Sequence, residues 1–389
     1  MDIVILAGGK GSRVKEMNPY LPKPMIKFNG INFLQILINH YSKFDIENIY
    51  ILAGYKGKII KKKFHNKIQN FVKIRCFIER KPLDTAGALN NIKKIIKNDF
   101  LLINGDTFFD IQNINILKKS THKNKMGCVA LVKSKKKVKL GNLDVSCKNI
   151  LIHKRSSKYI NAGVYYFKKK ILSLIKNRKL SMENDLIPYL IKGKLVNGKA
   201  LNNFFIDIGT PDDLNKAKSL LIKKLRRSAV FLDRDGVINY DKGYTHKFSN
   251  FKFRKNVIKF LKRISEHNRY IFLITNQAGI AKKKFSIKKF KILQKSIKSY
   301  LSKKNIFIND VEFCPHHPRG ILKKYTKKCK CRKPGNLMIK KIEKRWFIDK
   351  RKSYFIGDQP KDKMAARKSN LKFYFVKENI LKQVYNVNS

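Results

Sequence analysis

Near the start of the chain, the mostly apolar stretch Asp2-Ile3-Val4-Ile5-Leu6 runs directly into Ala7-Gly8-Gly9-Lys10-Gly11. The first stretch predicts a buried strand. The glycines that follow allow unusual backbone dihedrals and let backbone N–H groups approach an anion closely. Other apolar runs also lead into small or polar turns, among them Ile49–Leu52, Phe100–Ile103 and Tyr270–Ile274. Because helical stretches separate these runs, we predict an α/β fold with largely parallel sheets and with ligands beyond the carboxyl ends of the strands.

The length of the chain allows two domains. With 389 residues, of which 43% are hydrophobic and 11% aromatic, each domain can bury a core of its own. A helix that begins at Pro211 should end in the basic stretch Lys223–Arg227, and a new strand should begin at Ala229. We therefore place the boundary near 216–228 and predict two doubly wound, Rossmann-like domains, residues 1–222 and 229–389.

The location of the protein can be predicted from what the sequence lacks. It has no run of roughly 18 apolar residues, so we expect no membrane-spanning helix. The strand at Asp2–Leu6 leaves no room for a signal peptide. The six cysteines are unevenly spaced and do not suggest a disulfide framework. A reduced, cytoplasmic setting fits these observations.

The charge of the chain has two interpretations. A formal net charge of +63 favours binding to a polyanion such as nucleic acid, because Lys and Arg release counterions from a phosphate backbone. The lysines, however, are spread over nearly every predicted helix and loop together with many Ile and Asn, a mixture typical of an AT-rich genome. We therefore favour drift in composition and expect no specific nucleic-acid partner.

Several polar residues follow the glycine loop in the first domain. Arg13 is placed to reach a triphosphate, and Lys23 lies between two prolines. Asp106 and Asp207 each lie at a predicted strand end, and two such carboxylates could hold Mg²⁺ against a nucleoside triphosphate. The matching reaction is in-line attack of a sugar-1-phosphate oxygen on the α-phosphorus. A phosphate monoester is already anionic near neutral pH, so this attack needs no general base.

Over residues 1 to about 222 the chain resembles the sugar-phosphate nucleotidyltransferases, in particular the heptose-1-phosphate guanylyltransferases. The resemblance rests on six elements in the same order: Leu6–Arg13, Leu21–Met25, Glu79 with Pro82–Ala88, Asn104–Asp106, Asn161–Tyr165 and Asp207–Pro211. It implies that the nucleotide is bound by Gly8, Gly9, Gly11 and Arg13, and that Arg13 and Lys23 act in catalysis. It further implies that Asp106 and Asp207 bind Mg²⁺. Gly87 and Asn161 would line the base and sugar pockets. The family commonly carries Glu-Lys before the Asn-Ala-Gly element. This chain has His153-Lys154, which keeps a lysine for phosphate but lacks the carboxylate for sugar hydroxyls.

In the second domain, Asp233 and Asp235 follow the apolar run that begins at Ala229. Two carboxylates two residues apart point to the same side of a strand end. They can divide the work of phosphoryl transfer, with Asp233 as nucleophile and Asp235 as general acid and base. Three further elements complete such a site: Thr275-Asn276-Gln277 for phosphate, Arg332-Lys333 as cations and Gly357-Asp358, with Asp362 beyond, for Mg²⁺.

A group of cysteines and a histidine predicts a metal site beside these cations. Cys314 and His316 are followed by Cys329 and Cys331, which together offer three thiolates and an imidazole, a complete tetrahedral zinc set. No coordination position stays open, so the zinc should be structural. His317 is the less favoured ligand of the two adjacent histidines.

Residues 229 to about 377 resemble the zinc-containing haloacid dehalogenase-type phosphatases that act on heptose 1,7-bisphosphate, and more distantly histidinol phosphatase. The motifs that carry the resemblance are Asp233–Asn239, Gly243-Tyr244, Thr275–Ala281, Cys314–Pro318 and Cys331–Pro334. It implies Mg²⁺ on Asp233, Asp235 and Asp358, phosphate on Thr275, Asn276 and Lys333, and substrate on Arg332. Relatives often have Lys where this chain has Gln359.

Together the two resemblances predict a bifunctional enzyme of nucleotide-activated heptose synthesis. It would remove the 7-phosphate of D-glycero-D-manno-heptose 1,7-bisphosphate and then transfer a nucleotide, GMP from GTP, to the 1-phosphate. The alternatives are the same pair of reactions on another sugar phosphate, or a basic protein that binds or processes nucleic-acid ends. Neither the anomer of the heptose nor the oligomeric state follows from the sequence.

Overall fold

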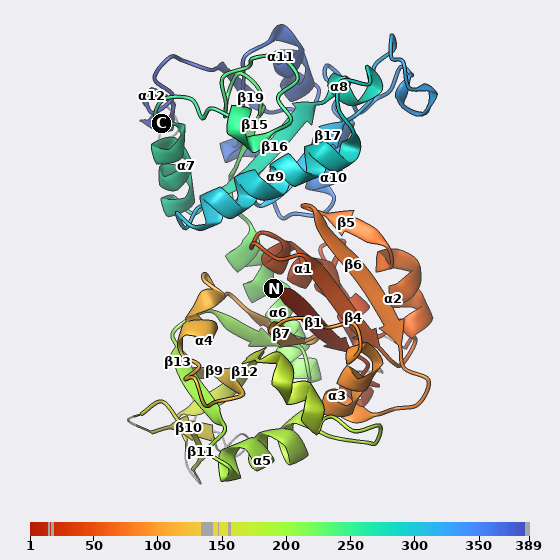
Figure 1. Cartoon of the computed structure of the whole chain (residues 1–389), viewed down its shortest axis with the longest axis vertical. Helices are drawn as coiled ribbons and strands as arrows, with labels where there is room; N and C mark the ends of the chain where they lie inside the picture. Colours follow the sequence, from red (N-terminus) through yellow and green to blue (C-terminus); the bar gives the residue numbers. More distant parts are fainter. Residues whose placement is uncertain (15, 17–18, 134–142, 147, 155–156, 386–389) are drawn as a thin grey trace. The chain divides into compact units, whose positions relative to one another are not determined.

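The structure is a computed structural model that describes residues 1–14, 16, 19–133, 143–146, 148–154 and 157–385 (Figure 1). The chain divides into two compact units. The first comprises Met1–Ile38, Ile46–Ile68 and Val72–Leu221, and the second comprises Asn39–Asp45, Gln69–Phe71 and Ile222–Ser389. The predicted helix before the second domain is α6 (Pro211–Leu225), and the strand after it is β15 (Ala229–Leu232). No helix in the described part of the chain is long and apolar enough to cross a membrane.

The first unit is built on an eight-stranded sheet within the described residues. In spatial order its strands are β13 (Val196–Leu201), β9 (Gly127–Lys133), β12 (Tyr159–Phe167), β7 (Phe100–Asn104), β1 (Asp2–Ala7), β4 (Asn48–Ala53), β6 (Val72–Ile78) and β5 (Lys67–Gln69). Strands β7, β1, β4 and β6 are parallel, as predicted, and β12 runs antiparallel to both β7 and β9. The chain thus leaves β1 toward β4 on one side and returns through β7 on the other, which makes the β1–β7 pair the point where the strand order reverses.

Short elements complete the first unit. The helices are α1 (Phe33–Ser42), α2 (Gly57–Phe64), α3 (Asp84–Gly87), α4 (Asn115–Lys119) and α5 (Ile187–Lys192), with a helical turn η5 (Met182–Leu186). Three strand pairs stand apart from the large sheet: β2 (Lys27–Phe28) with β3 (Ile31–Asn32), β10 (Leu143–Val145) with β11 (Leu151–His153), and β8 (Thr107–Phe109) with β14 (Phe205–Asp207). The β8–β14 pair places Asp207 opposite Thr107, so it brings two segments far apart in the sequence to one place.

The second unit contains a fully parallel sheet in the order β17-β16-β15-β18-β19. Its further strands are β16 (Tyr270–Asn276), β17 (Asp310–Cys314), β18 (Tyr354–Gly357) and β19 (Lys372–Phe375). The helices are α7 (Val257–Glu266), α8 (Ala278–Ala281), α9 (Ile287–Ser302), α10 (Leu337–Glu343), α11 (Pro360–Arg367) and α12 (Lys382–Tyr385). The strand order reverses between β15 and β18, where parallel sheets of this kind bind ligands.

Both faces of this sheet are covered, which is why its strands are apolar throughout. Val230 and Leu232 of β15 join one buried cluster together with residues of α7 and α9. Ala229 and Phe231, which point the other way, join a second cluster with residues of α10 and α11. The predicted α/β class is therefore confirmed, and the second unit is doubly wound.

Candidate active sites

The first site lies at the carboxyl ends of β1 and β7. A pocket of about 790 Å³ opens there, lined by Gly8, Gly9, Gly11 and Arg13 after β1 and by Asn104, Gly105 and Asp106 after β7. Gly105 allows the two strand ends to meet, because a Cβ at this position would lie 2.3 Å from the Leu6 carbonyl oxygen. The structure thus brings the predicted nucleotide-binding loop and the predicted metal ligand Asp106 to one pocket.

Lys23 also lines this pocket, next to Gly11 of the glycine loop. Gly11 has a φ of +60°, and a Cβ built on it would lie 3.2 Å from the Cβ of Lys23, so glycine suits both the backbone and the space. The Lys23 ammonium lies 2.6 Å from a carboxylate oxygen of Asp106. A lysine and a carboxylate are therefore paired where phosphates would lie.

Asp207 completes the charged group. Its carboxylate accepts a hydrogen bond from the Gly209 N–H. Burial, together with the negative charge of Asp106, raises the pKa of Asp207 to about 7, although the Gly209 N–H and Lys23 act in the opposite direction. Asp207 and the neighbouring Asp106 form a donor set suited to a divalent cation, which would relieve their mutual repulsion. The residues present therefore fit Mg²⁺.

Three residues that the resemblance placed in this pocket do not line it. Gly87 is buried against the chain, where its N–H donates to the Leu180 carbonyl at 2.9 Å. The Asn161 amide is bonded to the Tyr165 hydroxyl at 2.6 Å and to the Gly163 N–H at 2.9 Å. Lys154 is exposed, with its ammonium 3.7 Å from Asp144. In this structure the polar groups of Gly87 and Asn161 form hydrogen bonds within the first unit and do not line its pocket.

Three carboxylates that were not among the predicted site residues do line the pocket, Glu79, Asp84 and Glu183. Burial, helped by Asp84, raises the pKa of Glu79 to about 7. Burial, with Asp106 and Asp84, also raises the pKa of Glu183. Glu79 directly follows β6, so the rule of polar residues at strand ends could have found it. Glu183 lies in the helical turn η5, for which the sequence gives no comparable signal.

The second site lies at the carboxyl ends of β15 and β18. Asp233 follows β15, and its N–H donates to the Ile356 carbonyl of β18 at 3.1 Å. Asp358 follows β18. Gly236, with a φ of +84°, passes so close that a Cβ there would lie 2.2 Å from an oxygen of Asp358. The glycine of the Asp-Arg-Asp-Gly stretch is therefore required by both its backbone conformation and its space.

Lys333 is the buried cation of this site. Its side chain has no exposed surface, and its ammonium lies 2.7 Å from Asp233 and 2.7 Å from Asp362. It also donates to the Ile274 carbonyl at 2.9 Å. Burial opposes the charge of Lys333, but the two carboxylates outweigh it and raise its pKa. The pKa of Asp233 is raised to about 7, because burial and the charge of Asp362 raise it by more than Lys333 lowers it.

Three carboxylates gather where Mg²⁺ was predicted. Oxygens of Asp233, Asp358 and Asp362 lie within 4.8 Å of one another. Oδ1 of Asp358 is buried and has no hydrogen-bond partner among the described residues, which leaves it available to a cation. This donor set fits Mg²⁺. Asp235, which was also predicted as a ligand, is not part of this group, whereas Asp362 is.

Asp235 is instead held by nitrogen donors. Its oxygens accept hydrogen bonds from Arg234, from Asn239 at 3.2 Å and from Gln277 at 2.8 Å. It lines a pocket of about 380 Å³ together with Asp233, Asn276 and Arg332. Asp235 thus lies in the pocket beside the buried Asp233.

The predicted phosphate ligands divide into two kinds. Asn276 lines the pocket, but its amide also fixes Lys333, since it donates to the Lys333 carbonyl at 3.1 Å and accepts from the Lys333 N–H at 3.0 Å. Thr275 is buried and accepts from Gln277 at 2.8 Å. Neither Thr275 nor Lys333 is among the pocket-lining residues.

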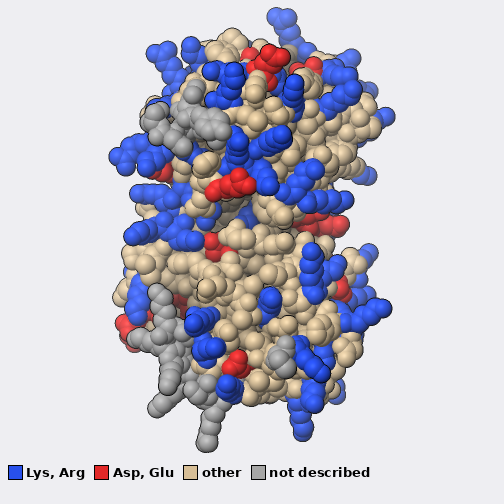
Figure 2. All heavy atoms as spheres, turned by 90° about the vertical axis from the view of Figure 1, so that its left-hand side faces the viewer, with Lys and Arg blue, Asp and Glu red and all other residues tan. Residues whose placement is uncertain are grey.

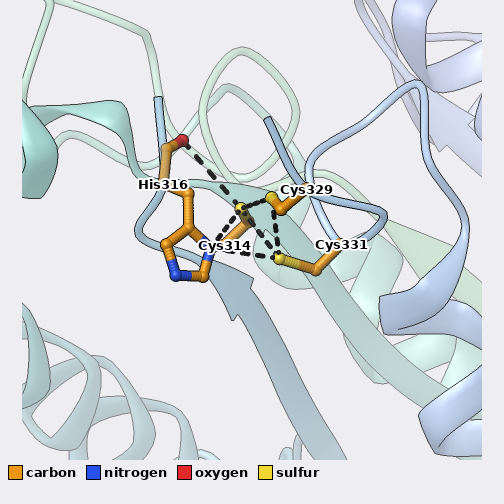
Figure 3. Close-up of side chains that lie close together, drawn as sticks. All are labelled: Cys314, His316, Cys329 and Cys331. Carbon is orange, nitrogen blue, oxygen red and sulfur yellow. Dashed lines mark hydrogen bonds between the residues drawn. The ribbon is translucent and has the colours of Figure 1, made fainter. Parts of the chain in front are cut away.

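The four predicted zinc ligands lie together, Cys314 at the end of β17 and the other three in the segment that follows it (Figure 3). The sulfurs of Cys314, Cys329 and Cys331 are 3.1 to 3.5 Å apart, and Nδ1 of His316 lies 3.3 Å from the Cys331 sulfur. His317 is outside this group. Three thiolates and an imidazole at the corners of a small tetrahedron fit zinc. The neighbouring Arg332 donates to the His316 carbonyl at 3.3 Å, so the cluster also holds a pocket-lining cation.

Each unit matches a known family of proteins. Residues 3–224 match the family model described as nucleotidyl transferase, and residues 230–377 match that described as polynucleotide kinase 3 phosphatase. The chain is 39% identical over 142 residues to the D-glycero-alpha-D-manno-heptose-1,7-bisphosphate 7-phosphatase of Photorhabdus laumondii, covering 36% of this chain and 78% of that protein. It is 36% identical over 143 residues to the corresponding beta-anomer phosphatase of Escherichia coli K12, covering 37% and 75%.

The first unit has a relative of its own. The chain is 34% identical over 238 residues to the bifunctional protein GlmU of Methanococcus aeolicus, covering 58% of this chain and 56% of that protein. The predicted resemblances to sugar-phosphate nucleotidyltransferases and to heptose-bisphosphate phosphatases, and the presence of two enzyme activities, are thereby confirmed. The chain therefore belongs to the nucleotidyl transferase family and, in its second unit, to the family of the heptose-bisphosphate 7-phosphatases that it matches.

Proposed function

We propose that the two sites catalyse consecutive steps on one heptose phosphate. The second unit removes the 7-phosphate of D-glycero-D-manno-heptose 1,7-bisphosphate, and the first unit couples the remaining 1-phosphate to a nucleotide. The observation that supports this most is the presence of both sites in one chain. The phosphatase has to spare the phosphate that the transferase uses as its nucleophile, so the two chemistries are complementary.

In the phosphatase site, the Asp233 carboxylate attacks the 7-phosphorus while the P–O bond to the sugar breaks. Asp235 gives a proton to the leaving oxygen and then takes one from the water that releases phosphate from Asp233. Lys333 neutralises charge beside Asp233 at 2.7 Å. Asp233, Asp358 and Asp362 would hold Mg²⁺, which when bound supplies further positive charge against the phosphate.

In the transferase site, the chain's own residues mainly position the two substrates and neutralise their negative charge. Arg13 and Lys23 face the triphosphate, and the N–H groups of the glycine loop bind its oxygens. Asp106 and Asp207 would hold Mg²⁺, which when bound offsets the triphosphate charge. The 1-phosphate oxygen attacks the α-phosphorus and pyrophosphate leaves.

Glu79 supports GTP as the nucleotide. Guanine presents two adjacent donors, its ring N–H and its amino group, and a carboxylate can accept from both. Adenine and cytosine present an acceptor at the corresponding ring position. A half-buried carboxylate on the pocket wall therefore favours guanine, and Glu79 is such a group.

Glu183 supports recognition of sugar hydroxyls. The chain lacks the acidic residue that relatives carry before the Asn-Ala-Gly element, where it has His153. Glu183 and Asp84 nevertheless line the same pocket as Asp106. We assign Glu183 the role of accepting hydrogen bonds from the hydroxyls of the heptose.

The zinc site also bears on the compartment. Thiolates bind zinc only while they are reduced, and the cysteines of the described residues form no disulfide. These features support a reducing, cytoplasmic location for the enzyme.

One observation favours a second candidate, a nucleic-acid end phosphatase: residues 230–377 match the family model of the polynucleotide kinase 3 phosphatases. A nucleic-acid surface should gather its basic residues into a patch. On the face that Figure 2 shows, Lys and Arg are scattered among other residues rather than gathered. Hydrolysis of a 3′-phosphorylated oligonucleotide faster than of the heptose bisphosphate would favour this candidate.

Phosphorus NMR tests the main proposal. The protein is incubated with Mg²⁺, with GTP or ATP, and with each anomer of heptose 1,7-bisphosphate. We expect loss of the 7-phosphate signal, followed by the paired signals of a nucleotide diphosphate sugar with GTP but not with ATP. Absence of turnover with either anomer would contradict the heptose assignment. Phosphate release without coupling to a nucleotide would contradict the proposed second step.

A further inference from the structure

Arg234, which lies between the two catalytic aspartates, turns its side chain back onto Asp235. Its Nε donates to Oδ1 of Asp235 at 3.0 Å, and its Nη2 contacts Oδ1 at 2.7 Å and Oδ2 at 2.8 Å. A planar guanidinium with several donors fixes a carboxylate in both position and direction, which a point charge cannot do. The contact therefore sets where the Asp235 oxygens lie.

The guanidinium is itself held rigidly. The Arg234 side chain is 1% exposed, and its guanidinium lies over the ring of Phe290 at 5.5 Å. Nη2 also reaches the Thr245 carbonyl and the Gln277 side-chain oxygen, each at 3.3 Å. Burying a charged group in this way is unfavourable unless an opposite charge pairs with it. Among the described residues, the carboxylate that pairs with Arg234 is Asp235.

We propose that Arg234 is the positioning residue of the phosphatase. It holds the Asp235 carboxylate in the place from which the proton reaches the leaving oxygen. The inference rests on the proposed phosphatase function. Arg234 exchanges no proton and forms no covalent bond. While the Asp233–phosphorus bond forms and the phosphorus–sugar bond breaks, the proton passes from Asp235 to the sugar oxygen, and Asp235 later regains one from water.

Leaving groups of different basicity separate this role from a structural one. A sugar alkoxide leaves only if it is protonated, so its loss depends on a correctly placed Asp235. p-Nitrophenolate and acetate leave without a proton. A residue that positions the acid should therefore matter for the sugar substrate and hardly at all for p-nitrophenyl phosphate or acetyl phosphate, whereas a residue that only stabilises the fold should matter equally for all three.

The experiment compares kcat/KM of the full chain and its Arg234→Met variant on heptose 1,7-bisphosphate, p-nitrophenyl phosphate and acetyl phosphate. Methionine keeps much of the packing against Phe290. We expect a fall of about 10²-fold on the sugar substrate, because a misplaced catalytic group costs about that much. On the two activated phosphates we expect less than about a threefold change. Arg254→Met is the matched control, since Arg254 donates to the Gly236 carbonyl at 2.8 Å and should leave the ratio of the rates unchanged.

The outcomes are separable. A wild-type protein that hydrolyses none of the three compounds contradicts the proposed phosphatase itself. A working wild-type protein whose Arg234→Met variant loses all activities in parallel, or none of them, overturns the role of Arg234 alone. If circular dichroism shows that Arg234→Met does not fold, Arg234→Lys replaces it, because lysine keeps the charge but not the planar fork. We expect the lysine variant to lose activity selectively on the sugar substrate, and full activity in it would overturn the inference.

Discussion

Both sites of this chain lie at the carboxyl ends of parallel strands, but the lysine of the second site is more deeply buried than the lysine of the first. In the first, Lys23 pairs with Asp106 at 2.6 Å and keeps 11% of its side chain exposed, beside a pocket of about 790 Å³. In the second, Lys333 pairs with Asp233 at 2.7 Å with no exposed surface, beside a pocket of about 380 Å³. The open site suits two large anions that react with each other. The closed one suits a reaction in which the protein itself is the nucleophile.

Because of this difference, the two sites should respond differently to the loss of a carboxylate. Removing the nucleophile of the closed site removes a bond-forming atom, whereas removing a carboxylate of the open site weakens positioning and charge balance. The following changes separate the two sites, in order of expected effect.

The largest effect should come from Asp233→Asn. The amide cannot attack phosphorus, so we expect phosphate release to fall by at least about 10⁴-fold, as when other enzymes lose their nucleophile. Pyrophosphate release from GTP and heptose 1-phosphate should be unchanged. Malachite green and pyrophosphatase-coupled assays on the same preparation measure both. Loss of both activities would contradict independent sites.

Asp106→Asn should have the next largest effect. It removes a proposed Mg²⁺ ligand and leaves Lys23 without its partner at 2.6 Å. We expect pyrophosphate release to fall by about 10²- to 10³-fold, the usual cost of losing one charge-stabilising group. Phosphate release from the bisphosphate serves as the internal control. If it fell as well, the change would act on more than the first site.

Cys329→Ser should affect the closed site moderately. The loss of one of four ligands should lower the zinc content measured by plasma mass spectrometry, and phosphatase activity should fall by about ten- to a hundredfold because Arg332 loses its support. Cys128→Ala, at a buried cysteine of β9, is the control that should retain zinc. Full zinc content in Cys329→Ser would contradict the assignment of the ligands.

The smallest effect concerns the open site and pH. The pKa of Glu79 is raised to about 7, so this group is protonated below that pH and ionised above it. Asp207 titrates in the same range and acts on both nucleotides. If the Glu79 carboxylate accepts the guanine donors, affinity for GTP should therefore rise by about tenfold more than affinity for ATP between pH 6 and 8. Calorimetric titration measures both. Glu79→Gln should abolish this difference, and an equal pH dependence for the two nucleotides would contradict the role of Glu79.

Much of this arrangement could be predicted because it follows from strand ends. The glycine loop after β1, Asp106 after β7, Asp233 after β15 and Asp358 after β18 each continue an apolar run in the sequence. In a parallel sheet the carboxyl ends of neighbouring strands lie side by side. The glycine loop therefore lies beside Asp106 in the first unit, and Asp233 lies beside Asp358 in the second. The zinc ligands could also be predicted from the sequence, because three cysteines and a histidine at this spacing are typical of a zinc site.

The rest depends on where a side chain points, and sequence does not give that. Asn161 and Thr275 lie at or near strands, but their polar groups bond to Tyr165 and Gln277. Asp362, and not Asp235, lies with Asp233 and Asp358, because the Arg234 guanidinium holds Asp235 and the turn into α11 places Asp362 beside Lys333. Glu183 reaches the first pocket from a helical turn with no motif of its own.

The central claim, two sites that act in succession on one substrate, is tested most directly by mixing two inactive variants. Neither Asp233→Asn nor Asp106→Asn alone should convert heptose 1,7-bisphosphate and GTP to a nucleotide sugar detected by phosphorus NMR. The account predicts that an equal mixture does so, with free heptose 1-phosphate as the intermediate. A mixture that remains inactive, while each variant keeps its other activity, would contradict it.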